Sequence, residues 1–374
     1  MKIGISEVLT ASGSPRIKLI KLVDLFVGGL LVRLVPAKRS AAAAAVKKIL
    51  IIRPGGMGDA VFVIPFIKRL KQTYPGIIVD ILCEGRNTSM FASQNELIAR
   101  LYTYDSVGSF LKALNSRYDI VVDTEQWHYL SALVAYFIKS DVKIGFASRP
   151  FRAKLFTHQI PYDFNEYELD SLQKLFRPLL PEIGATVALE RSFEVTEEDA
   201  YWSQGRIQEN SVALFLGGSL PQKRLNLEQH ARLIKFLLDK GRVPVLVGGH
   251  DYEEFSRQAE GAVKDARVLN LVGKLSLRQT AAVIQRSKLF IGTDSGLLHL
   301  ACALGKPTVS VFGSSNRKKW GPRGPQHVVL SDDLACSPCT HFSYSLPTCN
   351  GRFDCMNAFK TEKIEQAVAG LLKN

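Results

Sequence analysis

The hydrophobic pattern near the start of the chain predicts one amphipathic helix. Between residues 16 and 36, apolar side chains recur at spacings of three and four, which gathers them on one helical face: Leu19, Ile20, Val23, Phe26, Val27, Leu30, Leu31 and Leu34. The other side collects Lys18, Lys21, Asp24, Gly28, Gly29 and Arg33. These charges interrupt the run of about 20 apolar residues that a transmembrane helix needs. We expect a helix lying in the membrane interface, with packing on its own domain or on a second copy as the alternative.

From Lys47 onward, short β-branched runs alternate with helical patterns. The runs predict strands at residues 49–53, 77–83, 119–123 and 142–145, and then at 212–216, 244–247, 267–271, 289–292 and 308–312. Helical spacing occupies most of the intervals and also residues 362–372. This alternation predicts the α/β class, with parallel sheets covered by helices on both faces.

The strands form two series, which predicts two Rossmann-like domains facing a central cleft. A charged stretch over about residues 181–210 is expected to contain the connection between them. The expected organisation is a helical extension over 1–46, a first domain over 47–200 and a second domain over 201–374. Ligands of such sheets bind at the carboxyl ends of the strands, so the loops there should carry the chemistry.

The net charge and the length refine this picture. At 374 residues the chain is long enough for two domains. A net charge of +13 favours anionic partners such as nucleotide phosphates, acidic glycolipids or a membrane surface. No helix-turn-helix pattern, aromatic RNA-binding strand or zinc-finger spacing accompanies the charge, so no nucleic-acid partner is expected. No signal-peptide pattern is visible, which predicts a cytoplasmic protein, peripheral on the inner membrane.

The loop after the first strand is rich in glycine and ends in an acid. It fails as a dinucleotide fingerprint because Val61 stands where the third glycine belongs. Asp59 would also repel a pyrophosphate from the start of the following helix. A carboxylate here is better suited to removing a proton from a sugar hydroxyl, although capping the helix is the alternative role. The candidate acceptor loop comprises Arg53, Gly55, Gly56, Met57 and Gly58.

Two loops of the second series are candidates for phosphate binding. Each follows a strand, and together they combine backbone amides, a helix N-terminus and two adjacent cations, a combination that suits a diphosphate. In the second of these loops, Asp294 can accept hydrogen bonds from sugar hydroxyls. His299, about one turn later, either faces the ligand or is a core residue. The candidates are Gly217, Gly218, Ser219, Lys223, Arg224, Thr293, Asp294, Ser295, Gly296 and His299.

Four of the six cysteines lie close together near the C-terminus, at positions 336, 339, 349 and 355. In a cytosolic protein, clustered thiols favour metal binding over disulfides. Cys336, Cys339, Cys349 and Cys355 are therefore candidate ligands of a structural zinc ion. Disulfides and free thiols remain the alternatives, because Cys349 and Cys355 do not repeat the spacing of the first pair.

The loops together resemble glycosyltransferase family nine, the lipopolysaccharide heptosyltransferases. Residues 53–59, followed by Pro65 and Tyr74-Pro75, resemble the opening signature of that family. Residues 294–307, continuing to Phe312-Gly313, are similar to its second signature. The resemblance covers the chain from about Lys47 to the C-terminus.

This resemblance implies a GT-B fold and inverting transfer that requires no cofactor for catalysis. It implies an acceptor on the first domain and a nucleotide-sugar, ADP-heptose by the weight of the family, on the second. Asp59 resembles the family's catalytic base, and Lys223 resembles its diphosphate-binding lysine, although Arg224 follows where Trp-Pro is common. Asp294, Ser295, Gly296 and His299 look like donor-site residues.

Three other classes of protein remain as alternatives. A Rossmann oxidoreductase is disfavoured by the broken fingerprint and by the second glycine-rich half. A nucleotide-sugar epimerase of the same fold would turn over its donor without any acceptor. A non-catalytic, membrane-associated binding protein would hold the nucleotide-sugar and never release nucleotide. The expected acceptor of an active transferase is a glycolipid resembling the lipid A core.

Overall fold

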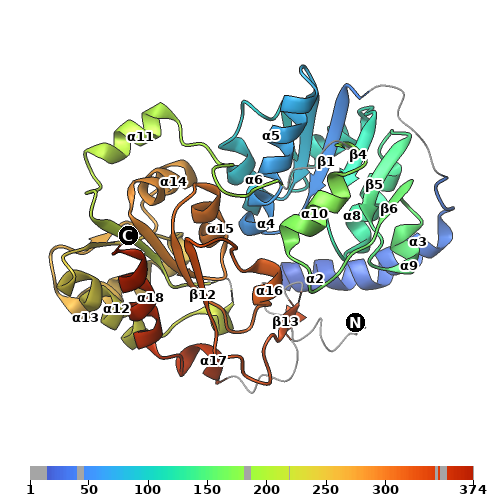
Figure 1. Ribbon diagram of the computed structural model, residues 1–374. Coiled ribbons are helices and arrows are strands. Elements are labelled where there is room, and N and C mark those ends of the chain that lie inside the picture. The colour runs from blue at the N-terminus through green and yellow to red at the C-terminus, as the bar shows by residue number, and fades with distance from the viewer. Residues whose placement is uncertain are drawn as a thin grey trace. The chain divides into compact units, whose positions relative to one another are not determined.

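The computed structural model describes residues 15–39, 46–180, 187–218, 220–341, 344–345 and 352–373 (Figure 1). Contacts between residues divide the chain into two units. The first contains Met1–Ala188 and Phe342–Tyr344, and the second contains Leu189–His341 and Ser345–Asn374. Each unit is built around its own parallel six-stranded sheet. Two short strands, β13 (Thr340–His341) and β14 (Tyr344–Ser345), pair in a separate sheet.

The sheet of the first unit has the order β3-β2-β1-β4-β5-β6, with every neighbouring pair parallel. Its strands are β1 (Lys48–Arg53), β2 (Ile78–Cys83), β3 (Arg100–Thr103), β4 (Ile120–Asp123), β5 (Val142–Phe146) and β6 (His158–Ile160). The helices that connect and cover them are α4 (Met57–Val61), α5 (Ile64–Thr73), α6 (Gly85–Ala92), α7 (Val107–Asn115), α8 (Tyr129–Phe137), α9 (Pro150–Ala153) and α10 (Glu168–Phe176).

The second unit repeats this topology with the order β12-β11-β10-β7-β8-β9. Its strands are β7 (Ser211–Phe215), β8 (Val243–Leu246), β9 (Leu269–Asn270), β10 (Leu289–Thr293), β11 (Thr308–Val311) and β12 (His327–Leu330). Its helices are α11 (Glu197–Gln204), η2 (Pro221–Lys223), α12 (Leu227–Asp239), η3 (His250–Tyr252), α13 (Glu253–Val263), α14 (Leu277–Arg286), α15 (Gly296–Ala303), α16 (Arg317–Trp320), α17 (Asp354–Asn357) and α18 (Thr361–Leu371).

Both sheets reverse their strand order once, next to the first strand of the unit. In the first unit the reversal lies between β1 and β4, and in the second it lies between β7 and β10. Such a switch point separates two loops at the carboxyl ends of neighbouring strands and is the usual ligand site of an open α/β sheet. The predicted α/β fold with two Rossmann-like parts is therefore confirmed. Each of the nine strands predicted from the sequence lies within two residues of an observed strand.

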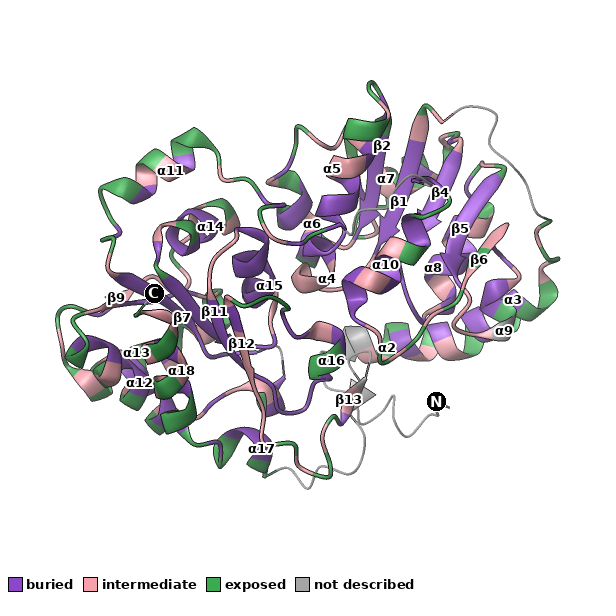
Figure 2. Cartoon of the chain, in the orientation of Figure 1, coloured by how far each residue is buried: buried purple, intermediate pink, exposed green. Residues whose placement is uncertain are grey.

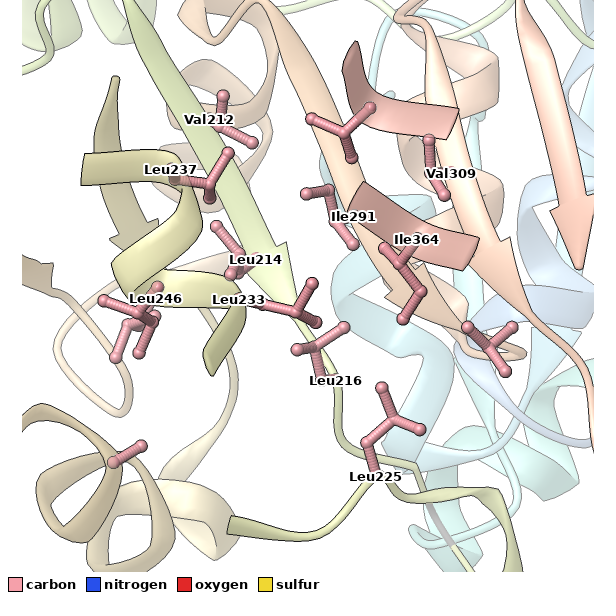
Figure 3. Close-up of a cluster of buried hydrophobic side chains, with 14 of the residues drawn as sticks. Val212, Leu214, Leu216, Leu225, Leu233, Leu237, Leu246, Ile291, Val309 and Ile364 are labelled. Atoms are coloured by element: carbon pink, nitrogen blue, oxygen red, sulfur yellow. The ribbon is translucent and has the colours of Figure 1, made fainter. Parts of the chain in front are cut away.

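Apolar side chains from the strands and the covering helices fill the core of each unit. In the second unit, Figure 3 shows side chains from β7, β8, β10, β11, α12 and α18 packed together: Val212, Leu214, Leu233, Leu237, Leu246, Ile291, Val309 and Ile364 are among the labelled residues. The central strands are buried along their whole length, as the purple arrows of Figure 2 show. A strand buried on both faces explains why these segments are continuous apolar runs.

The N-terminal segment is helical, as predicted, but it is not one regular helix. It consists of α2 (Pro15–Val23), a π-helical turn η1 (Asp24–Gly28) and α3 (Gly29–Leu34). The segment packs on its own unit with its polar side, because Lys21, Asp24 and Gly28 are buried while the predicted apolar face is exposed. Lys21 is thus directed inward, and burial, with a smaller effect of Arg86, lowers the pKa of its ammonium to about 8.

Across the described ranges of the chain, no helix is both long enough and apolar enough to pass through a bilayer.

Candidate functional site

The loop between β1 and α4 holds Asp59 by contacts to both of its carboxylate oxygens. Arg53 Nη2 lies 3.0 Å from Asp59 Oδ1, and the Gly56 amide donates to Asp59 Oδ2 at 3.0 Å. The second contact is half of a capping box, so Asp59 also has the capping role considered from the sequence. Its side chain remains 27% exposed, whereas that of Arg53 is 2% exposed. A fixed carboxylate that still reaches solvent is suited to accepting a proton from a bound hydroxyl.

Glycine is required in this loop at position 55. Gly55 has a φ of +112°, and a Cβ atom there would lie 3.1 Å from Asp59 Oδ2. The backbone conformation disfavours any residue with a side chain, and the carboxylate of Asp59 would have to shift to make room for a Cβ atom. The predicted acceptor-loop residues Gly55, Gly56, Met57 and Gly58 all follow β1 directly and are partly exposed.

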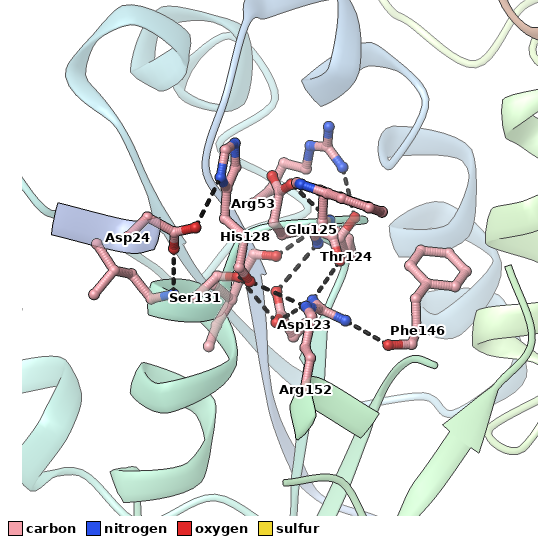
Figure 4. Close-up of polar contacts among 12 residues, drawn as sticks. Asp24, Arg53, Asp123, Thr124, Glu125, His128, Ser131, Phe146 and Arg152 are labelled. Atoms are coloured by element: carbon pink, nitrogen blue, oxygen red, sulfur yellow. Dashed lines mark hydrogen bonds and ion pairs between the residues drawn. The ribbon is translucent and has the colours of Figure 1, made fainter. Parts of the chain in front are cut away.

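A buried arginine organises the loop after β4, on the other side of the switch point (Figure 4). Arg152 Nη2 pairs with Asp123 Oδ2 at 2.7 Å. The same guanidinium donates to the backbone oxygens of Phe146, Glu125 and His128 at 2.5, 2.5 and 3.0 Å. Burial raises the pKa of the Asp123 carboxyl to about 6, against the opposing effect of Arg152. These contacts fix the backbone from residue 123 to residue 128.

Glu125 connects this loop to Arg53. Its carboxylate accepts from the Trp127 amide at 3.1 Å. Burial alone would raise the pKa of Glu125, but His128, Arg53 and that amide lower it overall. Burial would lower the pKa of Arg53, but Asp59 and Glu125 raise it. Arg53 therefore stays charged between the two acids, one on each side of the switch point.

Arg53 also bridges the two strands directly, since its Nη1 donates to the backbone oxygen of Thr124 at 2.7 Å. Residues 123–128 and 152 were not among the sequence candidates. The signal was present in Asp123 and Glu125, two acids at the end of a buried strand. The loop after β4 contains no glycine, unlike the other candidate loops, and was therefore not recognised.

In the second unit, the loop after β7 is packed by two side chains. A Cβ on Gly217 would lie 2.6 Å from the Tyr252 ring, and one on Gly218 would lie 2.7 Å from Lys223 Cβ. The Tyr252 hydroxyl donates to the Gly218 carbonyl, to which Arg224 Nε also donates at 2.8 Å. The glycines are therefore needed for the close approach of η2 and η3.

Lys223 and Asp294 meet across the switch point of this unit. Lys223 Nζ lies 2.5 Å from Asp294 Oδ2, and His299 Nε2 lies 3.6 Å from Asp294 Oδ1. Burial would raise the pKa of Asp294, but Lys223 and His299 hold it far below its usual range. The loops after β7 and β10, predicted to act together, are thus joined by a charged pair. His299 is buried beneath Asp294, and its ring centroid lies 6.3 Å from that of Trp320.

The helix that follows β10 begins with a regular cap. Ser295 Oγ accepts from the Leu298 amide at 3.3 Å, and Gly296 is the first residue of α15. Thr293 is buried, and its hydroxyl donates to the Gly217 carbonyl. Amides at a capped helix N-terminus can hold an anion. Ser219 lies outside the described residues.

Two of the cysteines near the C-terminus, Cys339 and Cys355, lie beside the turn at residues 313–314. Cys339 donates its amide to Ser314 O at 2.9 Å, and a Cβ on neighbouring Gly313 would lie 2.9 Å from Cys355 Sγ. Cys339 and Cys355 are buried, whereas Cys336 is exposed. Cys349 lies outside the described residues. Within the part of the chain that is described, no three His, Cys, Asp or Glu side chains converge as metal ligands, and none of the five cysteines there forms a disulfide.

Comparison with known protein families identifies one family for this chain. Residues 107–349 match the model of a family described as glycosyltransferase family 9 (heptosyltransferase). The chain is 26% identical to lipopolysaccharide heptosyltransferase 3 of Escherichia coli over 291 residues, which cover 71% of this chain and 83% of that protein.

Two solved structures share the fold. A family 9 glycosyltransferase from Veillonella parvula superimposes with a TM-score of 0.72 at 18% identity, covering 89% of this chain and 99% of that one. The dodecameric iron-containing heptosyltransferase TibC, in complex with ADP-D-β-D-heptose, gives a TM-score of 0.56 at 15% identity, covering 90% and 77%.

Proposed function

The chain belongs to glycosyltransferase family 9, and we propose on this basis that it transfers a heptose from ADP-heptose to a lipopolysaccharide core or a similar glycolipid. The choice of donor is supported by TibC, whose solved complex contains ADP-D-β-D-heptose. The choice of acceptor is supported by lipopolysaccharide heptosyltransferase 3, to which the chain is similar. The net charge of +13 suits a phosphorylated glycolipid.

The proposed reaction is a single displacement at the anomeric carbon. Asp59 removes the proton of the acceptor hydroxyl as its oxygen attacks, the bond from the anomeric carbon to the diphosphate oxygen breaks, and the configuration inverts. The observation that carries this assignment is the orientation of Asp59, whose two oxygens are held by Arg53 and Gly56 while the carboxylate stays partly exposed. Arg53 acts as a positioning residue.

The leaving diphosphate is assigned to the second unit. Lys223 contributes the positive charge, and the backbone around Gly217 and the N-terminus of α15 contribute amide donors. Asp294 positions Lys223 by pairing with its half-buried ammonium, and His299 lies against the other carboxylate oxygen of Asp294. Arg224, which lies against Gly218 and 5.2 Å from the centre of the Tyr252 ring, is a second cation of the same loop.

Turnover of ADP-heptose with and without acceptor tests this function. The transferase releases ADP only when a heptose-deficient lipopolysaccharide core is present, and NMR of the product shows the inverted anomer. A UDP-sugar under the same conditions serves as the donor control. Conversion of ADP-heptose without acceptor would favour an epimerase. Tight binding of ADP-heptose without ADP release in the presence of acceptor would favour a binding protein.

A structural metal site is proposed for Cys336, Cys339, Cys349 and Cys355, separate from catalysis. Thiolates suit zinc, and the placement of Cys339 and Cys355 beside one turn supports a shared site. Elemental analysis of protein purified under reducing conditions should find about one equivalent of zinc, and less than about 0.2 equivalents of any metal would contradict the site. Iron is measured as well, because TibC is described as iron-containing.

The enzyme is proposed to act as a peripheral protein on the cytoplasmic face of the inner membrane, with its N-terminal helical segment toward the bilayer. A lipid-linked acceptor requires the protein to approach a membrane surface. The positive net charge favours an anionic one.

A further inference from the structure

An exposed apolar face runs along α2, η1 and α3. All eight residues of the predicted apolar face are between 38% and 70% exposed. Phe151 of neighbouring α9 is also exposed, and the guanidinium of Arg33 lies 5.2 Å from the centre of its ring. Folded proteins rarely leave a continuous apolar surface of this kind without a partner.

The opposite face of the segment, which includes the buried Val32 as well as Lys21 and Asp24, holds it to its own unit. Asp24 Oδ1 accepts from the Leu130 amide at 2.8 Å, and Asp24 Oδ2 lies 3.3 Å from His128 Nδ1 (Figure 4). Because α8 begins at Tyr129, this carboxylate caps the N-terminus of α8 from outside. Burial would lower the pKa of His128, but Asp24 raises it overall, which favours the ion pair.

Gly28 allows the segment to lie close to α8, and Gly29 lies beside the same tyrosine. A Cβ on Gly28 would lie 3.1 Å from Tyr129 Cβ, and one on Gly29 would lie 3.6 Å from the Tyr129 ring. The polar residues and glycines are therefore already used in folding. Turning the apolar face inward would remove the Asp24 contacts, so that face remains available to something outside the unit.

The charge of the segment defines the chemistry of that partner. Residues 15–39 contain one acid, Asp24, and six cations: Arg16, Lys18, Lys21, Arg33, Lys38 and Arg39. Asp24 is buried against α8, whereas Arg33 and Arg39 are exposed. The exposed ionisable side chains described in this segment are thus all positive. An apolar face flanked by cations matches the interface of a bilayer with anionic headgroups.

We propose that α2, η1 and α3 form a membrane-binding surface, with the apolar face inserted among anionic lipids and Asp24 holding the segment to α8. The inference rests on the peripheral location proposed above and makes it specific, but it does not depend on the transfer reaction. Asp24 contacts residues 128 and 130, so the surface is attached directly to the loop that carries Glu125. Binding to the membrane would therefore fix how Arg53, Asp59 and Glu125 are oriented relative to the bilayer surface.

Vesicle binding by the full-length protein tests this surface. The wild type should sediment with phosphatidylcholine vesicles that contain phosphatidylglycerol, and less so at high salt. The variant F26E/L30E should lose about tenfold or more of this binding, because two exposed apolar side chains that would insert among the lipids become charged. Both residues are exposed, whereas the Asp24 anchor is buried against His128 and Leu130, and circular dichroism checks that the variant folds.

A matched control is available on α7, where Val107 and Leu111 are also exposed and four positions apart. V107E/L111E makes the same change of charge and should bind vesicles as the wild type does. Equal binding by F26E/L30E and the wild type would overturn the proposal. A wild type that ignores the vesicles and sediments as a dimer, with F26E/L30E a monomer, would also overturn it in favour of a second copy.

The transfer reaction provides an independent readout. F26E/L30E should keep its turnover with an acceptor core stripped of acyl chains and lose turnover with the same acceptor embedded in anionic vesicles. Absence of turnover in every protein, including the wild type, would count against the proposed donor or acceptor. The vesicle-binding result would still decide the membrane surface.

Discussion

At the scale of single residues, one cation joins the two loops at the switch point of each unit. In the first unit, Arg53 at the end of β1 contacts Asp59 and the Thr124 carbonyl after β4. In the second, Lys223 after β7 contacts Asp294 after β10. Removing one partner of a buried pair leaves the other uncompensated. These positions are therefore sensitive to substitution for reasons of stability as well as binding.

Lys223→Met should weaken the binding of ADP by about 10- to 100-fold, because one charge-assisted contact to the diphosphate is lost. Isothermal titration with ADP measures this change. Lys235→Met removes an exposed cation of α12 in the same unit and is expected to leave the affinity unchanged. If Lys223→Met bound ADP as tightly as the wild type, Lys223 would not contact the diphosphate.

His230 should make the second unit sensitive to acid. Its ring is buried, its Nδ1 lies 2.8 Å from the Asn226 carbonyl, and burial lowers its pKa to about 4. The unfolded chain, with a histidine pKa of about 6.5, binds more protons between these values. The free energy of unfolding should therefore fall as the pH drops from about 6.5 to 4, by up to about 3 kcal/mol from this group.

His230→Gln removes the titrating group, so its unfolding free energy should decline less over the same pH range. Urea denaturation at a series of pH values compares the two proteins. Parallel profiles for the variant and the wild type would show that His230 is not buried in the neutral form.

The sequence identified much of the candidate site at this scale, and the reason is physical. Asp59, Lys223 and Asp294 stand in glycine-containing loops at strand ends, so their positions could be predicted. The roles of Glu125 and Arg152 could not be predicted, because these residues are 27 positions apart in the sequence and Arg152 belongs to α9. Their contact, 2.5 Å between Arg152 Nη2 and the Glu125 carbonyl, is visible only in the folded structure. The pairing of Lys223 with Asp294, 71 residues apart, likewise depends on the strand order that brings β7 and β10 together.

At the scale of elements, the strands that escaped prediction are edge strands. β3, β6 and β12 lie at the ends of their sheets and are only partly buried. β3 and β6 have no continuous apolar run of three residues, whereas the central strands, which are buried on both faces, do. β12 does contain such a run, at residues 328–330. The N-terminal helical segment was predicted from the three- and four-residue spacing of its apolar side chains. Which face would pack could not be predicted, because the partners of Asp24 lie more than 100 residues away.

Asp24→Ala should lower the free energy of unfolding by about 0.5–2 kcal/mol, since α8 loses the carboxylate that caps its N-terminus. Urea denaturation measures the loss. Ser106→Ala is the matched control, because Ser106 Oγ accepts from the Ser109 amide at the start of α7 and gives the cost of an ordinary cap. An Asp24→Ala protein as stable as the wild type would mean that the N-terminal segment does not dock on α8.

At the scale of the whole molecule, the proposed chemistry is divided between two units that repeat one topology. The candidate base, Asp59, belongs to the first unit, and the candidate donor loops around Lys223 and Asp294 belong to the second. Each set stands at the switch point of its own sheet. Substitutions in the first unit should therefore change the chemical step without changing how tightly the nucleotide-sugar binds.

Turnover and donor affinity of Asp59→Asn test the central claim most directly. The asparagine has nearly the same shape but cannot accept the proton, so kcat should fall by about 10²–10⁴-fold. The Kd for ADP-heptose, measured by titration in the absence of acceptor, should stay at the wild-type value. A kcat close to that of the wild type, with the Kd unchanged, would contradict the assignment of Asp59 as the catalytic base.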